Sequence, residues 1–174
     1  MVFSFSPRRS ARRLCAALLV AGCAAALAAC GFHLRGPQAL AFSTLHVNLS
    51  PYSELGITLR RQLAMSGSTA VEENPERAEA RLQILANERT REILSLTAAG
   101  KVREYELVQR IRFRLVDRDG ADLIAPTNLI ARREYTFSDE QILGKEQEEA
   151  LLYRDMEADL VRQLMRRLAT WRRP

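Results

Sequence analysis

The chain has 174 residues, with 26 lysine and arginine residues against 21 aspartate and glutamate residues and a formal net charge of +5. Four of the arginines lie before residue 14, and the rest of the chain is nearly balanced at 22 to 21. The basic excess therefore does not indicate a nucleic-acid-binding protein, and the length requires no more than one domain.

The first residues have the three parts of an export signal. Arg8, Arg9, Arg12 and Arg13 form a cationic segment, and residues 14–29 carry no charge and end in small side chains. A retained transmembrane helix, the alternative, needs about 20 apolar residues. We therefore predict that residues 1–29 are a removable signal peptide.

Two segments resemble the bacterial lipobox, in which the cysteine is acylated and becomes the first residue. They are "LAAC", which ends at Cys30, and "VAGC", which ends at Cys23. We favour Cys30, because leucine is the commoner residue at the lipobox start and cleavage at Cys23 would leave an apolar segment behind. Its acyl chains would anchor the protein to a membrane. Gly31, rather than aspartate, follows Cys30 and indicates the periplasmic side of the outer membrane.

Residues 30–42 read as a lipidated tether, and residues 43–174 as a single domain. Alternating apolar residues predict a strand over 43–49. A helix should follow from an N-cap at Ser53 to about Met65, with Gly67 as its C-terminal cap. Residues 73–80 form a polar loop, and a strand over 81–96 should contain a bulge near Thr90.

The clearest alternation of the chain lies between a predicted hairpin turn at 98–101 and a second turn at 117–120. One face of this strand carries apolar residues and the other carries charges. The apolar face comprises Tyr105, Leu107, Ile111, Phe113 and Leu115, and the charged face Glu104, Glu106, Arg110, Arg112, Arg114 and Arg118.

A loop containing Pro126 should separate this strand from another over 128–137. The last element should be a helix that is capped by Ser138 or Asp139 and runs to about Trp171. The order is strand, helix, three strands, helix. We predict an α+β fold in which two helices pack on one face of a four-stranded mixed sheet.

The chain shows no catalytic signature. His33 and His46 have no metal-binding partner at ligand spacing, and no nucleophile is paired with a base. The acidic run at 146–149 reads as a solvated helix face, although paired acids could do acid–base work. We predict a protein that is not an enzyme and that has no catalytic residues, metal or cofactor.

Arg110, Arg112 and Arg114 should project together from one sheet face, about 7 Å apart. Three interpretations remain open: a solvated face, contact with a partner protein, or contact with an anionic glycolipid such as lipopolysaccharide. Further positive charge surrounds the first hairpin, at Arg89, Arg91, Lys101 and Arg103.

Four segments resemble the LptE family of lipopolysaccharide-assembly lipoproteins. "CGFHLRG" (30–36) is similar to the start of the mature family members, which favours Cys30 as the lipidated residue. "LRRQLAMSG" (59–67), "REYEL" (103–107) and "KEQEEALLYRDMEADLVRQLMRRL" (145–168) resemble the first helix, the opening of the central strand and the last helix.

The resemblance implies a subunit that plugs and helps assemble the LptD β-barrel and that assists delivery of lipopolysaccharide to the outer leaflet. Lys145 matches a basic family position implicated in lipopolysaccharide binding. The other such position falls near Ala98, which is not basic, so Arg91, Lys101 and Arg103 are candidate substitutes. The alternative function is a lipoprotein adaptor of another envelope-assembly machine.

Overall fold

The computed structural model describes residues 39–138 and 141–171. The predicted signal peptide, Cys23 and Cys30 lie outside these residues. The elements are β1 (Thr44–Val47), α2 (Glu54–Ser66), β2 (Ala70–Val71), β3 (Ala80–Leu96), β4 (Val102–Asp117), β5 (Asp122–Thr136) and α3 (Ile142–Thr170).

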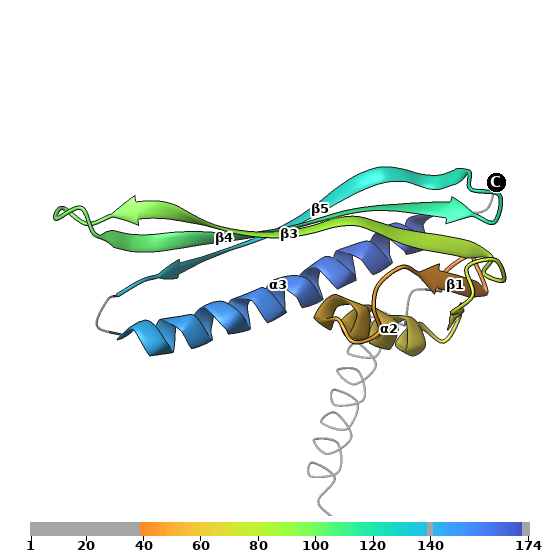
Figure 1. Ribbon diagram of the computed structural model, residues 1–174, viewed down its shortest axis with the longest axis horizontal. Helices are drawn as coiled ribbons and strands as arrows, with labels where there is room; N and C mark the ends of the chain where they lie inside the picture. Colours follow the sequence, from red (N-terminus) through yellow and green to blue (C-terminus); the bar gives the residue numbers. More distant parts are fainter. Residues whose placement is uncertain (1–38, 139–140, 172–174) are drawn as a thin grey trace, which may run out of the picture. The chain divides into compact units, whose positions relative to one another are not determined.

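The strands form one mixed sheet in the order β2-β1-β3-β4-β5. β1 runs parallel to β2 and β3, and β3, β4 and β5 are antiparallel to one another. Both helices lie on the same face of the sheet (Figure 1). The predicted fold class is confirmed, but the sheet has five strands rather than four. The missed strand, β2, has two residues, which is too short for an alternating pattern to reveal it.

α2 begins and ends where the sequence predicts. The Ser53 hydroxyl accepts a hydrogen bond from the Gly56 backbone N–H at 3.1 Å, so one free donor of the first turn is satisfied. Gly67 ends the helix in the left-handed conformation at φ 66°. Leu55, Leu59 and Leu63 form its buried stripe.

The register of β3 against β4 shifts between Ile84 and Ala86 and again between Ile93 and Leu96, and Thr90 lies in regular pairing between these places. The strand is therefore bulged as predicted, but on both sides of Thr90 rather than at it. A one-residue bulge reverses which side chains face the core. After the bulge between Ile84 and Ala86, Arg89 pairs with Gln109, and Arg91 pairs with Leu107. Since Gln109 and Leu107 are fully buried on the helix-facing side of β4, the two arginines also face the helices.

β4 has the predicted alternation, with the residues of the predicted apolar face in or against the hydrophobic core. β5 differs from expectation, because it runs from Asp122 straight through Pro126, where a loop was predicted. The strand lies at the edge of the sheet, where the missing proline N–H need not reach a partner strand. A register shift between Phe113 and Leu115 of β4 accommodates it.

The predicted cap of the last helix was also wrong. The N-cap of α3 is Gln141, which makes no side-chain capping bond. Ser138 instead accepts a hydrogen bond from the Gln141 backbone N–H through its own carbonyl, at 3.1 Å. Asp139 lies outside the described residues.

The core fills the space between the sheet and the two helices. It also takes in Leu40 and Phe42, which are 8% and 2% exposed and belong to the range predicted as a tether. The Phe42 ring lies 6.2 Å from the Trp171 ring, centroid to centroid, at the end of α3. Within the residues described, no helix is long and apolar enough to cross a membrane.

Candidate functional site

A set of charged and hydroxyl side chains lies between β3 and α3, on the side of the sheet that faces the helices. We call it the inter-layer network. Its members are Arg89, Arg91, Tyr135, Glu149, Tyr153 and Glu157. The bulge in β3 creates it, because without the reversal Arg89 and Arg91 would point to the opposite face.

Arg89 is the centre of one half of this network. Its guanidinium is 2.6 Å from the Glu157 carboxylate and 3.3 Å from that of Glu54, and it lies 5.2 Å from the centroid of the Tyr153 ring. The Glu157 side chain is 5% exposed. Burial raises the pKa of Glu157, and the nearby charge of Arg89 lowers it. Arg89 therefore opposes the effect of burial and favours the charged form of Glu157.

Arg91 is the centre of the other half. Its guanidinium is 2.9 Å from a Glu149 oxygen and lies 4.7 Å from the centroid of the Tyr105 ring. The Tyr135 hydroxyl donates to the same Glu149 oxygen at 2.6 Å. Burial, and then this bond, raises the pKa of Tyr135 to about 12, and the bond to Glu149 raises the pKa of Arg91. Both groups keep their protons at neutral pH.

Two parts of this network were missed or misread in the sequence. The acidic run 146–149 was interpreted as a solvated face, but Glu149 is 21% exposed and accepts from two partners. Glu157 was not singled out. A signal was present, because Glu157 lies four residues after Tyr153 and four before Val161, on the stripe that predicts the buried side of α3.

A pocket of about 440 Å³ opens beside the network. It is lined by Glu54, Arg89, Arg91, Glu146, Glu149, Ala150, Tyr153 and Arg154. Arg154 has no ion-pair partner in the part of the chain that the structure describes. Arginine presents forked donors to phosphate and carboxylate groups, so this lining suits a polar, charged group rather than an apolar one.

The four basic residues predicted to contact lipopolysaccharide fall into two groups. Lys145, in the first turn of α3, is 2.8 Å from Glu148 and 3.2 Å from the Thr136 hydroxyl. Arg91 binds the next residue, Glu149, so Lys145 and Arg91 meet the same stretch of α3. Lys101 lies in the exposed turn between β3 and β4, and Arg103 is the second residue of β4, close to that turn.

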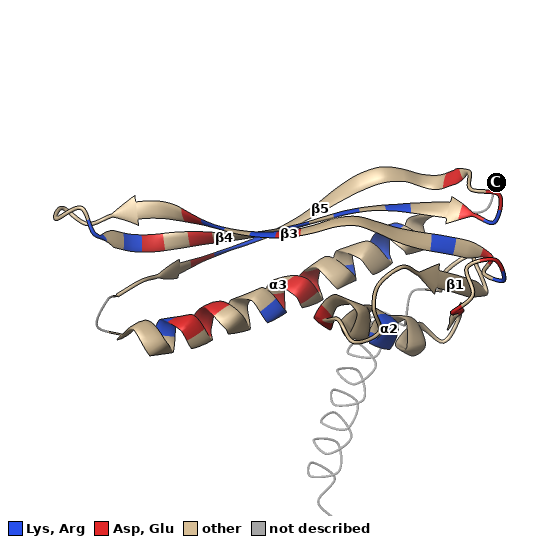
Figure 2. Cartoon of the chain, viewed as in Figure 1, with Lys and Arg blue, Asp and Glu red and all other residues tan. Residues whose placement is uncertain are grey.

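Arg110, Arg112 and Arg114 lie on the opposite side of β4, where neither of the described helices, α2 and α3, covers the sheet (Figure 1). Arg110 is 3.9 Å from Glu88, and Arg114 is 3.7 Å from Asp122. Arg112 makes no ion pair within residues 39–138 and 141–171. Figure 2 shows basic bands along the middle of the sheet, and both acidic and basic bands towards the β3–β4 turn.

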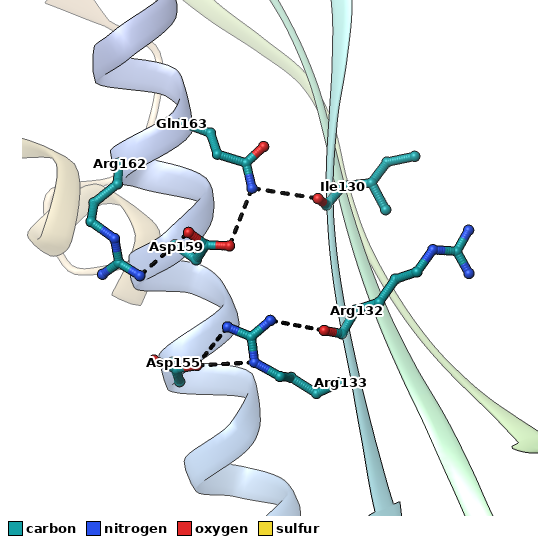
Figure 3. A network of polar contacts seen from close by, with 7 residues as sticks. All are labelled: Ile130, Arg132, Arg133, Asp155, Asp159, Arg162 and Gln163. Carbon is teal, nitrogen blue, oxygen red and sulfur yellow. Dashed lines mark hydrogen bonds and ion pairs between the residues drawn. The ribbon is translucent and has the colours of Figure 1, made fainter.

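A second polar network joins α3 to the edge strand β5 (Figure 3). Arg133 is 2.7 Å from Asp155 and donates to the Arg132 carbonyl at 2.8 Å. Gln163 donates to the Ile130 carbonyl at 3.5 Å. These bonds keep α3 alongside β5 and occupy backbone acceptors of the strand.

The described part of the chain contains no group of three or more histidine, cysteine, aspartate or glutamate side chains that could hold a metal ion. His46 contacts the Glu72 carbonyl through Nδ1 at 3.0 Å, and His33 lies outside the described residues.

Comparison with known proteins gives concordant matches in sequence and structure. The family model described as "LptE: Lipopolysaccharide-assembly" matches residues 42–168. A protein of Pectobacterium atrosepticum named LPS-assembly lipoprotein LptE is 30% identical over 156 residues, which cover 87% of this chain and 84% of that protein.

Among solved structures, that of lipoprotein B from Nitrosomonas europaea has a TM-score of 0.67 and 36% identity, covering 80% of this chain and 90% of that one. The rare lipoprotein B of Shewanella oneidensis has a TM-score of 0.64 and 24% identity, covering 74% and 95%. The second likeness, at this identity, shows a shared fold alone.

Proposed function

Since this chain belongs to the LptE family of lipopolysaccharide-assembly proteins, we propose that it is a lipid-anchored subunit of the outer membrane. In this role it plugs and helps assemble an LptD-like β-barrel and assists delivery of lipopolysaccharide to the outer leaflet. The observation that carries the proposal is the family match over residues 42–168, which spans the core from Phe42 to Leu168.

The anchor in this proposal is Cys30. An acylated cysteine there would be followed by only nine residues before Leu40, the first residue of the core. Nine extended residues reach about 30 Å. The acyl chains would therefore hold the domain close to the periplasmic side of the membrane.

The surface of the domain supports a place inside a barrel. The lumen of a membrane β-barrel is polar and hydrated, and the uncovered side of the sheet carries Arg110, Arg112 and Arg114 with Glu88 and Asp122. A protein held in a lumen needs such polar outward surfaces. It needs no catalytic group.

For lipopolysaccharide, we propose contact with Lys145 and Arg91, with Arg103 and Lys101 at the neighbouring hairpin end. Lys145 and Arg91 sit beside consecutive carboxylates of α3, and the pocket next to Arg91 is lined mainly by charged side chains. The phosphates of lipopolysaccharide are suitable ligands for forked arginine donors and for a lysine ammonium group.

The test of the main proposal is isolation of the protein from its native host in mild detergent. We expect a large outer-membrane β-barrel to co-purify with it, and mass spectrometry to find an acylated amino terminus at residue 30. A Cys30→Ser variant is the control, since it should lose the anchor. If the protein is recovered without any β-barrel, the proposed role as a barrel plug is contradicted. If a different protein co-purifies, the alternative function as an adaptor of another envelope-assembly machine is favoured.

For the glycolipid contact, we expect Lys145→Asp to weaken lipopolysaccharide binding by about tenfold, the effect of losing one charged hydrogen bond. Binding of the purified protein to lipopolysaccharide measures this. Arg61→Asp, an exposed residue of α2 with the same change of charge, is the matched control and should bind normally. If both variants bind lipopolysaccharide with equal affinity, Lys145 does not contribute to the contact.

A further inference from the structure

The side of β3, β4 and β5 that faces away from the helices carries a row of carboxylates towards the β3–β4 turn and a run of arginines along β4, and a few residues of opposite sign pair with single members of each set. We call this side the outer face. We infer that the outer face docks on the inner wall of the barrel, against a protein surface whose charges run in the opposite order. Basic side chains would meet the end near the β3–β4 turn, and acidic ones would meet the middle of β4. This inference rests on the proposed function.

Three carboxylates form a row across the strands at the first of these places. Glu106 of β4 pairs with Glu92 of β3 and with Glu134 of β5. Side chains that are directly opposite each other lie about 5 Å apart, and like charges in such pairs are destabilising. Only Glu106 has an ion pair, with Arg132 at 2.9 Å. Glu92 and Glu134, both exposed, have none in the described part of the chain.

The basic side chains lie at the second of these places, along the middle of β4. Arg110, Arg112 and Arg114 follow one another on the outer face, with cross-strand neighbours that neutralise them poorly. The ion pairs of Arg110 and Arg114 are long, at 3.9 and 3.7 Å. Arg112 is exposed and lies between Ala86 and Asn128, neither of which carries a charge.

This separation of charges contributes little to the stability of the isolated domain. A solvated surface is best served by interspersed charges, and exposed ion pairs at these distances contribute little to stability. The unpaired carboxylates, Glu92 and Glu134, cannot neutralise the unpaired guanidinium of Arg112, because their row crosses β4 at Glu106, six positions from Arg112. That separation is about 20 Å along the strand. A partner surface whose charges run in the reverse order would neutralise both the unpaired carboxylates and the unpaired arginine.

The same pattern would set the orientation of the domain in the barrel. Complementary charges steer association and fix the register of two surfaces, and juxtaposed like charges oppose association. A domain turned end to end would place its carboxylates on the acidic part of the wall. The outer face therefore admits one direction of insertion and opposes the reverse.

The test uses the full-length protein, expressed in its native host and isolated with its partner. We expect Arg112→Glu to reduce the recovered barrel about tenfold, and added salt to narrow the difference between the variant and the wild type, because salt screens exposed charges. Arg61→Glu, which makes the same charge change on α2, is the control and should recover wild-type amounts. Urea unfolding should show that both variants are as stable as the wild type.

Crosslinking keeps the inference testable if the variant proteins are made poorly. A photo-crosslinking side chain at Asn128, in the row of Arg112, should link to the barrel, and one at Arg61 should not. If the wild type recovers the barrel but links to it from residue 61 and not from residue 128, the inference is overturned while the proposed function stands. If the wild type recovers no barrel, the proposed function fails and the inference fails with it.

Discussion

Replacing Arg89 with methionine is expected to lower the free energy of unfolding by about 3 kcal/mol at neutral pH, which is the lower end of the range for breaking a buried ion pair. Glu157, its partner at 2.6 Å, is 5% exposed, whereas the Arg89 side chain is 37% exposed. The variant thus leaves the more deeply buried charge without its cation. The apolar part of the side chain is kept, so packing is little changed.

The loss of stability caused by Arg89→Met should be small at low pH and larger at neutral pH. Burial already raises the pKa of Glu157, and Arg89 lowers it, so removing Arg89 raises that pKa further. Below the ordinary value of 4.5, Glu157 is protonated in the folded and the unfolded chain, and the variant loses little. As the pH rises above this value, the unfolded chain releases its proton before the folded one does. The stability of the variant then falls until its folded-state pKa is passed.

Urea unfolding of the purified protein at pH 4 and at pH 7.5 measures both effects. The double variant Arg89→Met with Glu157→Gln removes the buried charge as well and should recover most of the stability at pH 7.5. An equal loss at the two pH values would show that Arg89 acts by packing and not through the charge of Glu157.

Replacing Phe113 with alanine should destabilise the domain by about 3–5 kcal/mol, the usual effect of deleting a buried aromatic side chain. Phe113 is fully buried in the core at the middle of β4. It pairs with Ile84 of β3 and Thr127 of β5, so the cavity would open under the centre of the sheet. Urea denaturation of the two proteins under one set of conditions gives the difference.

The neighbouring residue gives a matched control. Arg112 precedes Phe113 but projects from the outer face, and Arg112→Ala should change stability by no more than about 0.5 kcal/mol. A large loss in Arg112→Ala together with a small one in Phe113→Ala would mean that the two faces of β4 are exchanged relative to the structure.

The parts of the fold that local sequence determines were predictable. Ser53 and Gly67 cap α2 by interactions within a few residues, and the alternation along β4 follows from burial on one face of a strand. The errors arose where tertiary pairing decides. A two-residue strand such as β2 exists only through its pairing with β1, and Pro126 is compatible with a strand only because β5 is at the edge.

The inter-layer network was harder to predict, for a related reason. A shift of one residue at Leu85 decides that Arg89 and Arg91 face α3, and nothing in the alternation around it fixes the position of the shift. Arg91 was nevertheless a candidate from its charge. The pairing of Arg91 with Glu149 and of Arg89 with Glu157 could be recognised only from the three-dimensional arrangement of β3 and α3.

The bonds between α3 and β5 have a consequence for the free edge of the sheet. An open strand edge is a template on which further copies can stack into fibrils. Gln163 and Arg133 already take the carbonyls of Ile130 and Arg132, and Asp155 holds Arg133 in place. With these two carbonyls occupied, the edge strand β5 offers fewer free acceptors on which a strand of another copy could pair.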